Sequence, residues 1–265
     1  MPSPISQMQA PDDLLGIFCD IDDTLTVDGR LVPGVLDWMT AARSRGLAIV
    51  PITGRPGGWV DHIARAWPVD GVVGENGGLW FWFDGRKLQR RFFQPADERR
   101  INRVKLDALA TTILERVPGS ALASDQPYRD LDLAIDFCED VPALSSTAID
   151  AIVSCFIEAG ATAKISSIHV NGWYGHFDKL EGVQRFHQDR YGTAIDFQRW
   201  AFFGDSANDE PMFKAFPYSI GVANVRDFLD RMTHHPRFIT QSVGGHGFCE
   251  GMSHLLGTSS PSQAG

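Results

Sequence analysis

The sequence predicts an α/β protein with a doubly wound parallel-sheet core and an inserted α+β domain. In two stretches of the chain, short apolar segments that end in polar residues alternate with amphipathic segments. Such alternation is typical of a parallel sheet with helices on its faces and right-handed connections. Between the two stretches the pattern changes to hairpin and long-helix signals. We therefore predict a split core at residues 12–83 and 178–257, an insert at 84–177, and flexible tails at 1–11 and 258–265.

The core elements are predicted from apolar runs and from their flanking residues. Pro33 suits the first turn of a helix, and Gly46 suits the C-terminal cap of the same helix. The expected order is a strand at 14–19, a helix at 33–45, a strand at 48–52, a helix at 58–67, a strand at 71–73, a helix opening at 178, and strands at 200–203 and 219–222.

The insert is predicted to be an open-faced sheet with helices on one side and the other face free. Residues 79–83 and 87–93 flank an Asp84-Gly85 turn, which predicts a β-hairpin. Residues 131–137 alternate apolar and polar side chains, as in a strand with one exposed face. The remaining expected elements are helices at 95–117 and 143–159 and a strand at 162–170 that turns at Asn171-Gly172.

Composition limits the classes of partner and of compartment. The chain has 265 residues, of which 43% are hydrophobic, so it can bury a large core. Its formal net charge of −9 and the absence of a basic run argue against a nucleic-acid partner and against an anionic membrane surface. The four cysteines have no metal-binding spacing, and there is no secretory signal or long apolar span. We expect a reduced, cytoplasmic setting and leave the oligomeric state open.

The strongest chemical signal is the segment Asp20-Ile21-Asp22-Asp23-Thr24, which follows an apolar run. A strand that ends in three carboxylates concentrates negative charge at one edge of a sheet. Because isolated buried charge is costly, such a cluster normally holds a cation or performs chemistry. Ligands of open α/β sheets bind at the carboxyl ends of the strands, where these residues are expected to lie.

Three further motifs follow in order: Thr53-Gly54-Arg55 after a second strand, Asp178-Lys179 at the start of a helix, and Gly204-Asp205-Ser206-Ala207-Asn208-Asp209 after a third strand. Together the four resemble the motifs of the haloacid dehalogenase (HAD) superfamily, from about residue 14 to about residue 251. The insert resembles the larger type of cap domain in the Cof-like and sugar-phosphate phosphatase branch. The segment Gly74-Glu75-Asn76-Gly77-Gly78 also looks like that branch.

The resemblance, taken with the residue types, implies a chemical role for each carboxylate. Asp20 is the expected nucleophile, which would form an aspartyl-phosphate. Asp22 is the expected acid and base for the leaving oxygen and for water. A Mg²⁺ ion is expected between Asp20 and the substrate phosphate, held by the side chains of Asp20 and Asp205 and by the Asp22 carbonyl. Asp209 is placed in the metal site as well, where it would orient Lys179 or a metal-bound water.

The expected substrate is a small phosphorylated metabolite. Thr53 and Lys179 are the catalytic residues that would bind the transferring phosphoryl group. Polar residues near the insert are expected to recognise the sugar, whereas Trp80 and Trp82 are read as packing residues. The predicted substrate-binding residues are Thr53, Gly54, Arg55, Asn76, Arg129, Asn171, His176, Lys179 and Asn208.

Two other classes remain open beside a Mg²⁺-dependent phosphatase acting on a sugar phosphate. One is a phosphotransferase like phosphomannomutase, which would return the phosphoryl group to a sugar and would need a bisphosphate activator. The other is a non-enzymatic Mg²⁺-binding module that accepts a phosphoryl group, such as a receiver domain. Receiver domains lack the large insert and the Gly-Asp-x-x-Asn-Asp motif, so the phosphatase is the preferred interpretation.

Overall fold

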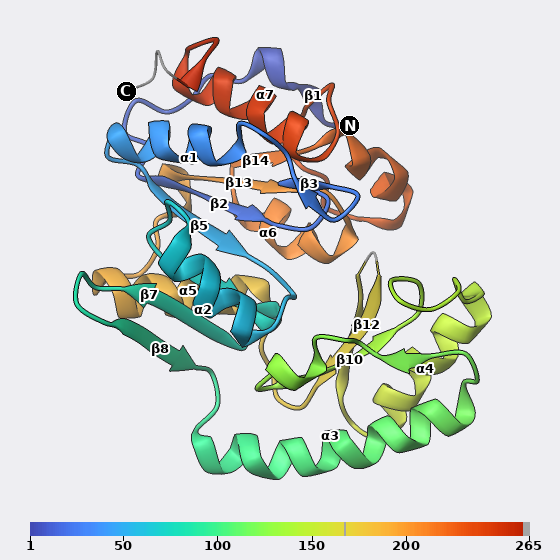
Figure 1. The fold of residues 1–265 in the computed structure, drawn as a ribbon. Helices are drawn as coiled ribbons and strands as arrows, with labels where there is room; N and C mark the ends of the chain where they lie inside the picture. The colour runs from blue at the N-terminus through green and yellow to red at the C-terminus, as the bar shows by residue number, and fades with distance from the viewer. Residues whose placement is uncertain (167, 262–265) are drawn as a thin grey trace.

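The computed structural model describes residues 1–166 and 168–261. Its centre is a nine-stranded sheet in the order β1-β15-β14-β13-β2-β5-β6-β7-β8, and Figure 1 shows the parallel strands β13, β2 and β5 at its middle. All neighbours pair in parallel except β6–β7 and β7–β8. The strands are β1 Ser3–Pro4, β2 Gly16–Asp20, β5 Ala48–Ile52, β6 Val72–Gly74, β7 Leu79–Phe83, β8 Leu88–Phe92, β13 Trp200–Gly204, β14 Tyr218–Gly221 and β15 Phe238–Ile239.

Helices cover both faces of this sheet because its central strands are apolar on both sides. In β2, Ile17 and Cys19 belong to one hydrophobic cluster, whereas Phe18 between them belongs to another. This alternation follows from the period of two in a strand. The first cluster contains residues of α1 (Val35–Ser44), α2 (Gly57–Ala66) and α7 (Gly244–Leu256), and the second contains residues of α5 (Lys179–Tyr191) and α6 (Glu210–Ala215). The predicted doubly wound core is confirmed.

The inserted domain, residues 96–173, is a four-stranded antiparallel sheet with two helices on one face. The helices pack on that face through a third hydrophobic cluster, which includes Ile113, Leu133 and Phe156. Figure 1 shows the domain beside the carboxyl ends of the core strands. Its elements are α3 Ala96–Arg116, β9 Ala121–Leu122, β10 Asp132–Asp136, α4 Ser146–Glu158, β11 Thr162–Ile165 and β12 His169–Trp173.

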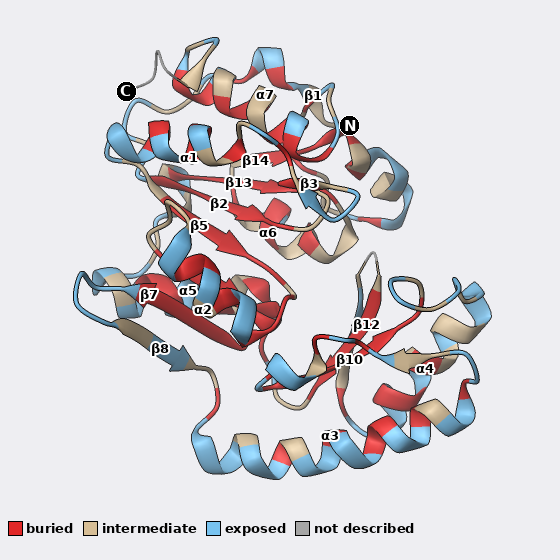
Figure 2. Cartoon of the chain, in the orientation of Figure 1, coloured by how far each residue is buried: buried red, intermediate tan, exposed pale blue. Residues whose placement is uncertain are grey.

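The face of the inserted domain's sheet that carries no helices is not exposed to solvent, although the sequence pattern predicts that it is. Every residue of β10 and of β12 is buried, including the polar ones, and Figure 2 shows both strands in the colour of buried residues. Asp132, Asp136, His169 and Asn171 are each less than 4% exposed. These side chains face the core. The alternation of apolar and polar residues, which predicts a face exposed to solvent, therefore corresponds here to a buried polar wall.

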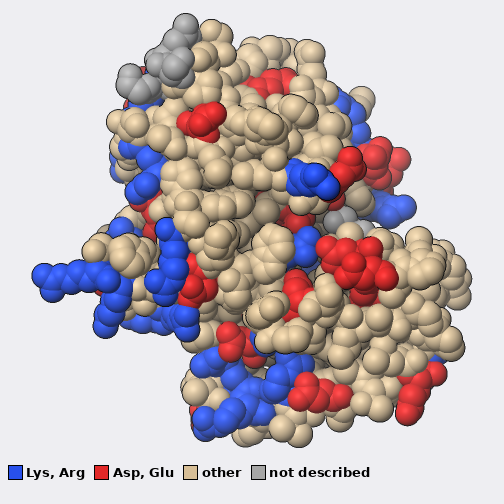
Figure 3. All heavy atoms as spheres, in the orientation of Figure 1, with Lys and Arg blue, Asp and Glu red and all other residues tan. Residues whose placement is uncertain are grey.

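The predicted start of the insert at residue 84 differs from the structure. The hairpin at 79–92 pairs both of its strands into the core sheet, where β8 is the edge. Trp80 and Trp82 are buried in the core, as predicted. Basic side chains gather along β8 and the start of α3, where Figure 3 shows a basic area. Charged residues on an edge strand discourage pairing with other chains.

Two further expectations need correction. The predicted flexible N-terminal tail contains β1, which pairs with β15, and Ile5 is only 2% exposed in the core. The predicted single strand at 162–170 is two antiparallel strands, and Asn171-Gly172 lie inside β12 rather than at a turn. The predicted C-terminal tail lies partly outside the described residues. No helix in the described part of the chain is long and apolar enough to cross a membrane.

Candidate active site

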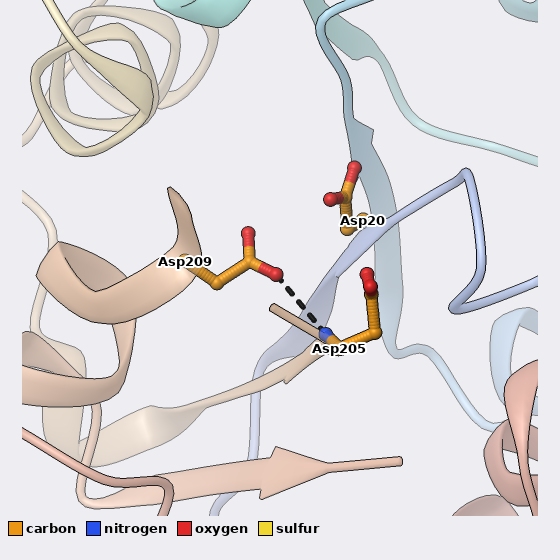
Figure 4. Close-up of side chains that lie close together, drawn as sticks. All are labelled: Asp20, Asp205 and Asp209. Atoms are coloured by element: carbon orange, nitrogen blue, oxygen red, sulfur yellow. Dashed lines mark hydrogen bonds between the residues drawn. The ribbon is translucent and has the colours of Figure 1, made fainter. Parts of the chain in front are cut away.

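The motif carboxylates meet because two neighbouring strands end together. Strand β2 ends at Asp20, and Asp205 follows β13, which pairs with β2 in parallel. The chain then turns through a short 3-10 helix at Ala207–Asp209, where Ser206 and Asp209 form a capping box. This turn returns Asp209 to the cluster, and its Oδ2 accepts a hydrogen bond of 3.1 Å from the Asp205 backbone N–H. Figure 4 shows the three carboxylates and this bond.

Lys179 supplies the positive charge of the cluster. It is the first residue of α5, and Asp178 caps the helix by accepting a hydrogen bond from the Glu181 N–H. The Lys179 Nζ donates to Asp20 Oδ2 at 2.6 Å and to Asp209 Oδ1 at 2.8 Å. Burial lowers the pKa of Lys179, but the two carboxylates outweigh burial, so the pKa is raised. The lysine is therefore charged at neutral pH.

One lysine leaves the cluster short of positive charge. Oxygen atoms of Asp20, Asp205 and Asp209 all lie within 4.8 Å of one another, and all three side chains are buried. Burial, opposed by Lys179, raises the pKa of Asp20 to about 7, and burial together with Asp209 raises the pKa of Asp205. Such shifts indicate buried carboxylates whose charge is not fully compensated. A set of carboxylate oxygens with missing positive charge fits Mg²⁺, which prefers hard oxygen ligands.

The second motif forms the loop beside Asp20. Ile52, the last residue of β5, pairs with Asp20, so Thr53 follows directly at the same edge. Thr53 is fully buried, and its Oγ1 accepts a hydrogen bond of 3.0 Å from the Arg55 N–H. A Cβ at Gly54 would lie 3.3 Å from the side-chain oxygen and nitrogen of Asn76, so glycine permits this close contact. Among the residues that the structure describes, none is a hydrogen-bond partner of the buried Asn76 Nδ2 atom.

Arg55 makes an ion pair that the motifs do not predict. Its Nη2 lies 3.0 Å from Asp22 Oδ1, and its Nε donates to both carboxylate oxygens at 3.1 Å. The same guanidinium lies 3.4 Å from Glu139 and 3.7 Å from Asp125, both in the inserted domain. Its other side stacks on Trp59, with 4.7 Å to the ring centroid. Arg55 thus holds Asp22 on the side of the core that faces the inserted domain.

The inserted domain contributes a hydrogen-bonded wall around Arg129. This guanidinium lies 3.0 Å from both Asp125 and Asp132 and donates to the Gly54 carbonyl at 2.9 Å. Asn171 Nδ2 donates to Asp132 Oδ2 at 3.0 Å. The Gly54 contact joins the wall to the core loop that carries the second motif.

A cavity lies between the core carboxylates and this wall. It brings together most of the predicted site residues, but not His176, which is exposed and lies outside the cavity lining. Three predicted residues are not part of the lining but form hydrogen bonds within the site. Thr53 accepts from Arg55, and Lys179 donates to Asp20 and Asp209. The lining residues are Asp20, Asp22, Gly54, Arg55, Asn76, Arg129, Ser166, Ile168, His169, Asn171, Asp205, Ser206 and Asn208.

His169 is a lining residue that the motifs do not single out. It lies two residues before Asn171 in β12, so the strand period places both on one face. Its Nε2 lies 2.9 Å from Glu139 Oε2. Burial and the nearby Arg129 charge lower the pKa of His169, which makes it neutral at pH 7. The strand period is the sequence signal that could have found it.

Glu75 is a second residue missed by sequence reasoning. Its carboxylate is fully buried and accepts hydrogen bonds from the backbone N–H groups of Gly57, at 2.9 Å, and of Asp130 and Leu131, at 2.8 and 2.6 Å. It therefore joins helix α2 of the core to the start of β10. Burial and the nearby Asp132 raise the pKa of Glu75 to about 8.

Comparison with known proteins supports the fold. Residues 144–250 match the family of haloacid dehalogenase-like hydrolases. This range spans the second half of the inserted domain and most of the returning core, including Lys179 and Asp205. A search of curated protein sequences finds no match.

Solved structures resemble the chain over nearly its whole length. A protein of Thermoplasma acidophilum gives a TM-score of 0.72 at 18% identity and covers 91% of this chain and 98% of its own. The sucrose-phosphatase of Synechocystis sp. PCC6803, solved with sucrose and phosphate, gives 0.65 at 17% identity, with 92% and 98% covered. A sugar phosphatase of HAD subclass IIB gives 0.61 at 15% identity, with 91% and 98% covered. At these identities the likeness establishes the fold.

Proposed function

We propose that this chain, which has the fold of the haloacid dehalogenase-like hydrolases, is a Mg²⁺-dependent phosphatase that acts on a small sugar phosphate. The observation that carries the proposal is the position of the Asp20 carboxylate. It lies at the carboxyl end of a central strand, bonded to a buried lysine and within 4.8 Å of two further carboxylates. The solved relatives named as sugar phosphatases support the choice of substrate class.

Asp20 is the proposed nucleophile. One of its oxygens, Oδ1, accepts the Ile21 N–H at 2.8 Å, and the other accepts from Lys179. These bonds fix the orientation of the carboxylate at the cavity. Attack on phosphorus forms an aspartyl-phosphate and releases the alcohol, and water then cleaves the new bond to give inorganic phosphate. Two displacements thus replace one difficult hydrolysis.

Asp22 is the proposed acid and base. It lies at the cavity on the side of the inserted domain, where Arg55 holds its carboxylate by a bidentate ion pair. The leaving oxygen points away from the nucleophile in an in-line displacement and therefore toward this side. Asp22 would first take up a proton from solvent, give that proton to the leaving oxygen, and then take one from the attacking water.

The remaining residues stabilise the charge of the phosphoryl group. Lys179 stands beside Asp20, and the buried Thr53 offers its hydroxyl at the same edge of the sheet. Asp20 and Asp205 would hold Mg²⁺, with Asp209 positioning Lys179. The ion would neutralise repulsion between the nucleophile and the phosphate. Asn76 presents an unpartnered amide to the cavity, which suits an oxygen of the substrate.

The test is a screen of phosphorylated metabolites with Mg²⁺ that reads released phosphate, with Asp20→Asn as the blank. Acid quenching during turnover of a phosphorus-labelled substrate should leave label on the protein that hydroxylamine removes, as expected for an acyl phosphate. A phosphotransferase would require a bisphosphate activator, and a receiver-like module would show one phosphorylation event without turnover. Phosphate release by Asp20→Asn at the wild-type rate would disprove the proposed mechanism.

A further inference from the structure

The cavity contains two arginines whose charges are already used within the protein. We infer that the leaving group of the substrate carries no negative charge, so that the transferring phosphate is its only anionic group. The preferred substrates are then monophosphates of uncharged polyols and sugars, not phosphorylated sugar acids and not bisphosphates. This inference rests on the proposed function, and it concerns the half of the cavity beyond the phosphoryl site.

Arg129 cannot serve a substrate anion without losing its protein partners. Its side chain is 1% exposed. Its Nε and Nη2 donate to Asp125 at 3.0 and 3.2 Å. Its Nη1 donates to both oxygens of Asp132, at 3.0 and 3.1 Å, and to the Gly54 carbonyl. A guanidinium with buried, charge-assisted bonds of this kind is a fixed structural element.

Arg55 is committed in the same way. Asp22 takes its Nε and Nη2 atoms, and Glu139 accepts from Nη1 and Nη2 at 3.4 Å. Its side chain is 10% exposed, and Trp59 covers one face of the guanidinium. A substrate carboxylate could bind Arg55 only by displacing Asp22, the proposed acid, or Glu139.

In this half of the cavity, the carboxylates of the protein therefore outnumber its guanidinium groups. Even when Asp22 carries the proton that it gives to the leaving oxygen, the two guanidinium groups face three carboxylates, those of Asp125, Asp132 and Glu139. His169 adds no charge, because burial lowers its pKa. A second anion on the substrate would meet carboxylates whose counter-ions are already paired. Unpaired like charges of this kind are how a site rejects the wrong ligand.

Uncharged hydroxyl groups fit the same wall. A hydroxyl can donate to a carboxylate oxygen and accept from an amide, and neither step requires an ion pair to break. Asn171 and His169 lie side by side on β12 at the cavity, and Glu139 contacts His169 and Arg55. Acceptors thus outnumber free donors on this wall, which suits a ligand rich in hydroxyl hydrogens.

The experiment compares kcat/KM for substrates matched except for one carboxylate. The pairs are glycerol 3-phosphate against 3-phosphoglycerate, and glucitol 6-phosphate against 6-phosphogluconate. We expect the neutral member of each pair to be preferred by at least about tenfold in the wild-type enzyme. Equal or higher kcat/KM for the acids would overturn the inference.

A charge variant tests the cause of the preference. Glu139→Gln frees part of the Arg55 guanidinium and should lower the neutral-to-acid ratio by about tenfold. Glu158→Gln is the matched control, since Glu158 is in the same domain, 58% exposed, and paired with Arg116. An unchanged ratio in Glu139→Gln, or an equal change in both variants, would refute the charge argument. If the wild-type enzyme had no activity on any of the matched substrates and none on p-nitrophenyl phosphate, the proposed function itself would be refuted, and with it the inference.

Discussion

The two walls of the cavity hold their buried carboxylates in different ways. The core wall places Asp20, Asp205 and Asp209 around one lysine, so negative charge remains without a partner. The wall of the inserted domain surrounds Arg129 with two carboxylates and a carbonyl, so no positive charge is left over. The core wall suits a ligand that brings positive charge, whereas the carboxylates beside Arg55 and Arg129 in the other wall already form ion pairs with these arginines. On this basis we propose that the core performs the chemistry and that the inserted domain selects the substrate.

The largest expected effect is on the nucleophile. Asp20→Asn keeps the shape of the side chain but cannot attack phosphorus, so kcat should fall by at least about a thousandfold with every substrate. Phosphate release and the folded far-UV spectrum would be measured together. If more than about one per cent of activity remained without deamidation of the new asparagine, the nucleophile would have to be another group.

Removal of the metal should abolish activity, because the proposed metal ligands all lie in the core wall. A chelator should eliminate turnover, and Mg²⁺ should restore it, whereas Ca²⁺ should not, because it takes more ligands at longer distances. Mg²⁺ should also raise the melting temperature of the wild-type protein, because it binds only the folded state. This increase should vanish in Asp205→Asn and persist in Asp107→Asn, which changes an exposed residue of α3. Full activity in chelated enzyme would rule out a required metal.

A smaller effect is expected from the wall of the inserted domain. Asn171→Ala removes a side chain that lines the cavity and bonds Asp132, so KM for sugar phosphates should rise about five- to tenfold, the worth of one hydrogen bond. Activity on p-nitrophenyl phosphate, which has no hydroxyl groups, should change little. His176→Ala is the matched control because His176 is exposed and outside the cavity lining. Equal changes in the two variants would place sugar recognition elsewhere.

The last expected effect is on stability and not on activity, and it concerns Glu75, which joins the domains. Its pKa is about 8 in the folded protein and about 4.5 ordinarily, so the folded state keeps a proton that the unfolded state has lost. The stabilising contribution is therefore present below about pH 4.5 and is lost as pH rises through about 8. The urea midpoint, measured with saturating Mg²⁺, should fall with pH across this range. Glu75→Gln should flatten the slope, and Glu158→Gln should not; identical slopes in wild type and Glu75→Gln would contradict this role.

The elements that were predicted well are those with strong local signals. The helices α1 and α3 start and end within two residues of expectation, and Gly46 and Pro95 lie at their boundaries. Pro33, which was expected in the first turn of α1, instead lies just before the N-cap residue Gly34. Gly46 indeed has a positive φ of 82°. The strand ends that carry Asp20, Thr53 and Asp205 were predicted because apolar runs stop there. His176 lies outside the cavity lining, since nearness to Lys179 in the chain says nothing about which way a linker turns.

The sequence by itself determined the fold class and which polar residues gather in the core wall. Apolar runs of strand length dictate buried parallel strands, and the carboxyl ends of such strands must meet at one edge. Only the tertiary structure decided the other wall. The same residue pattern on β10 and β12 is compatible with a polar face exposed to solvent and with a polar face that packs against a second domain. The ion pairs of Arg55 and Arg129 join residues from separate segments, whose contact depends on how the domains pack and not on any local period.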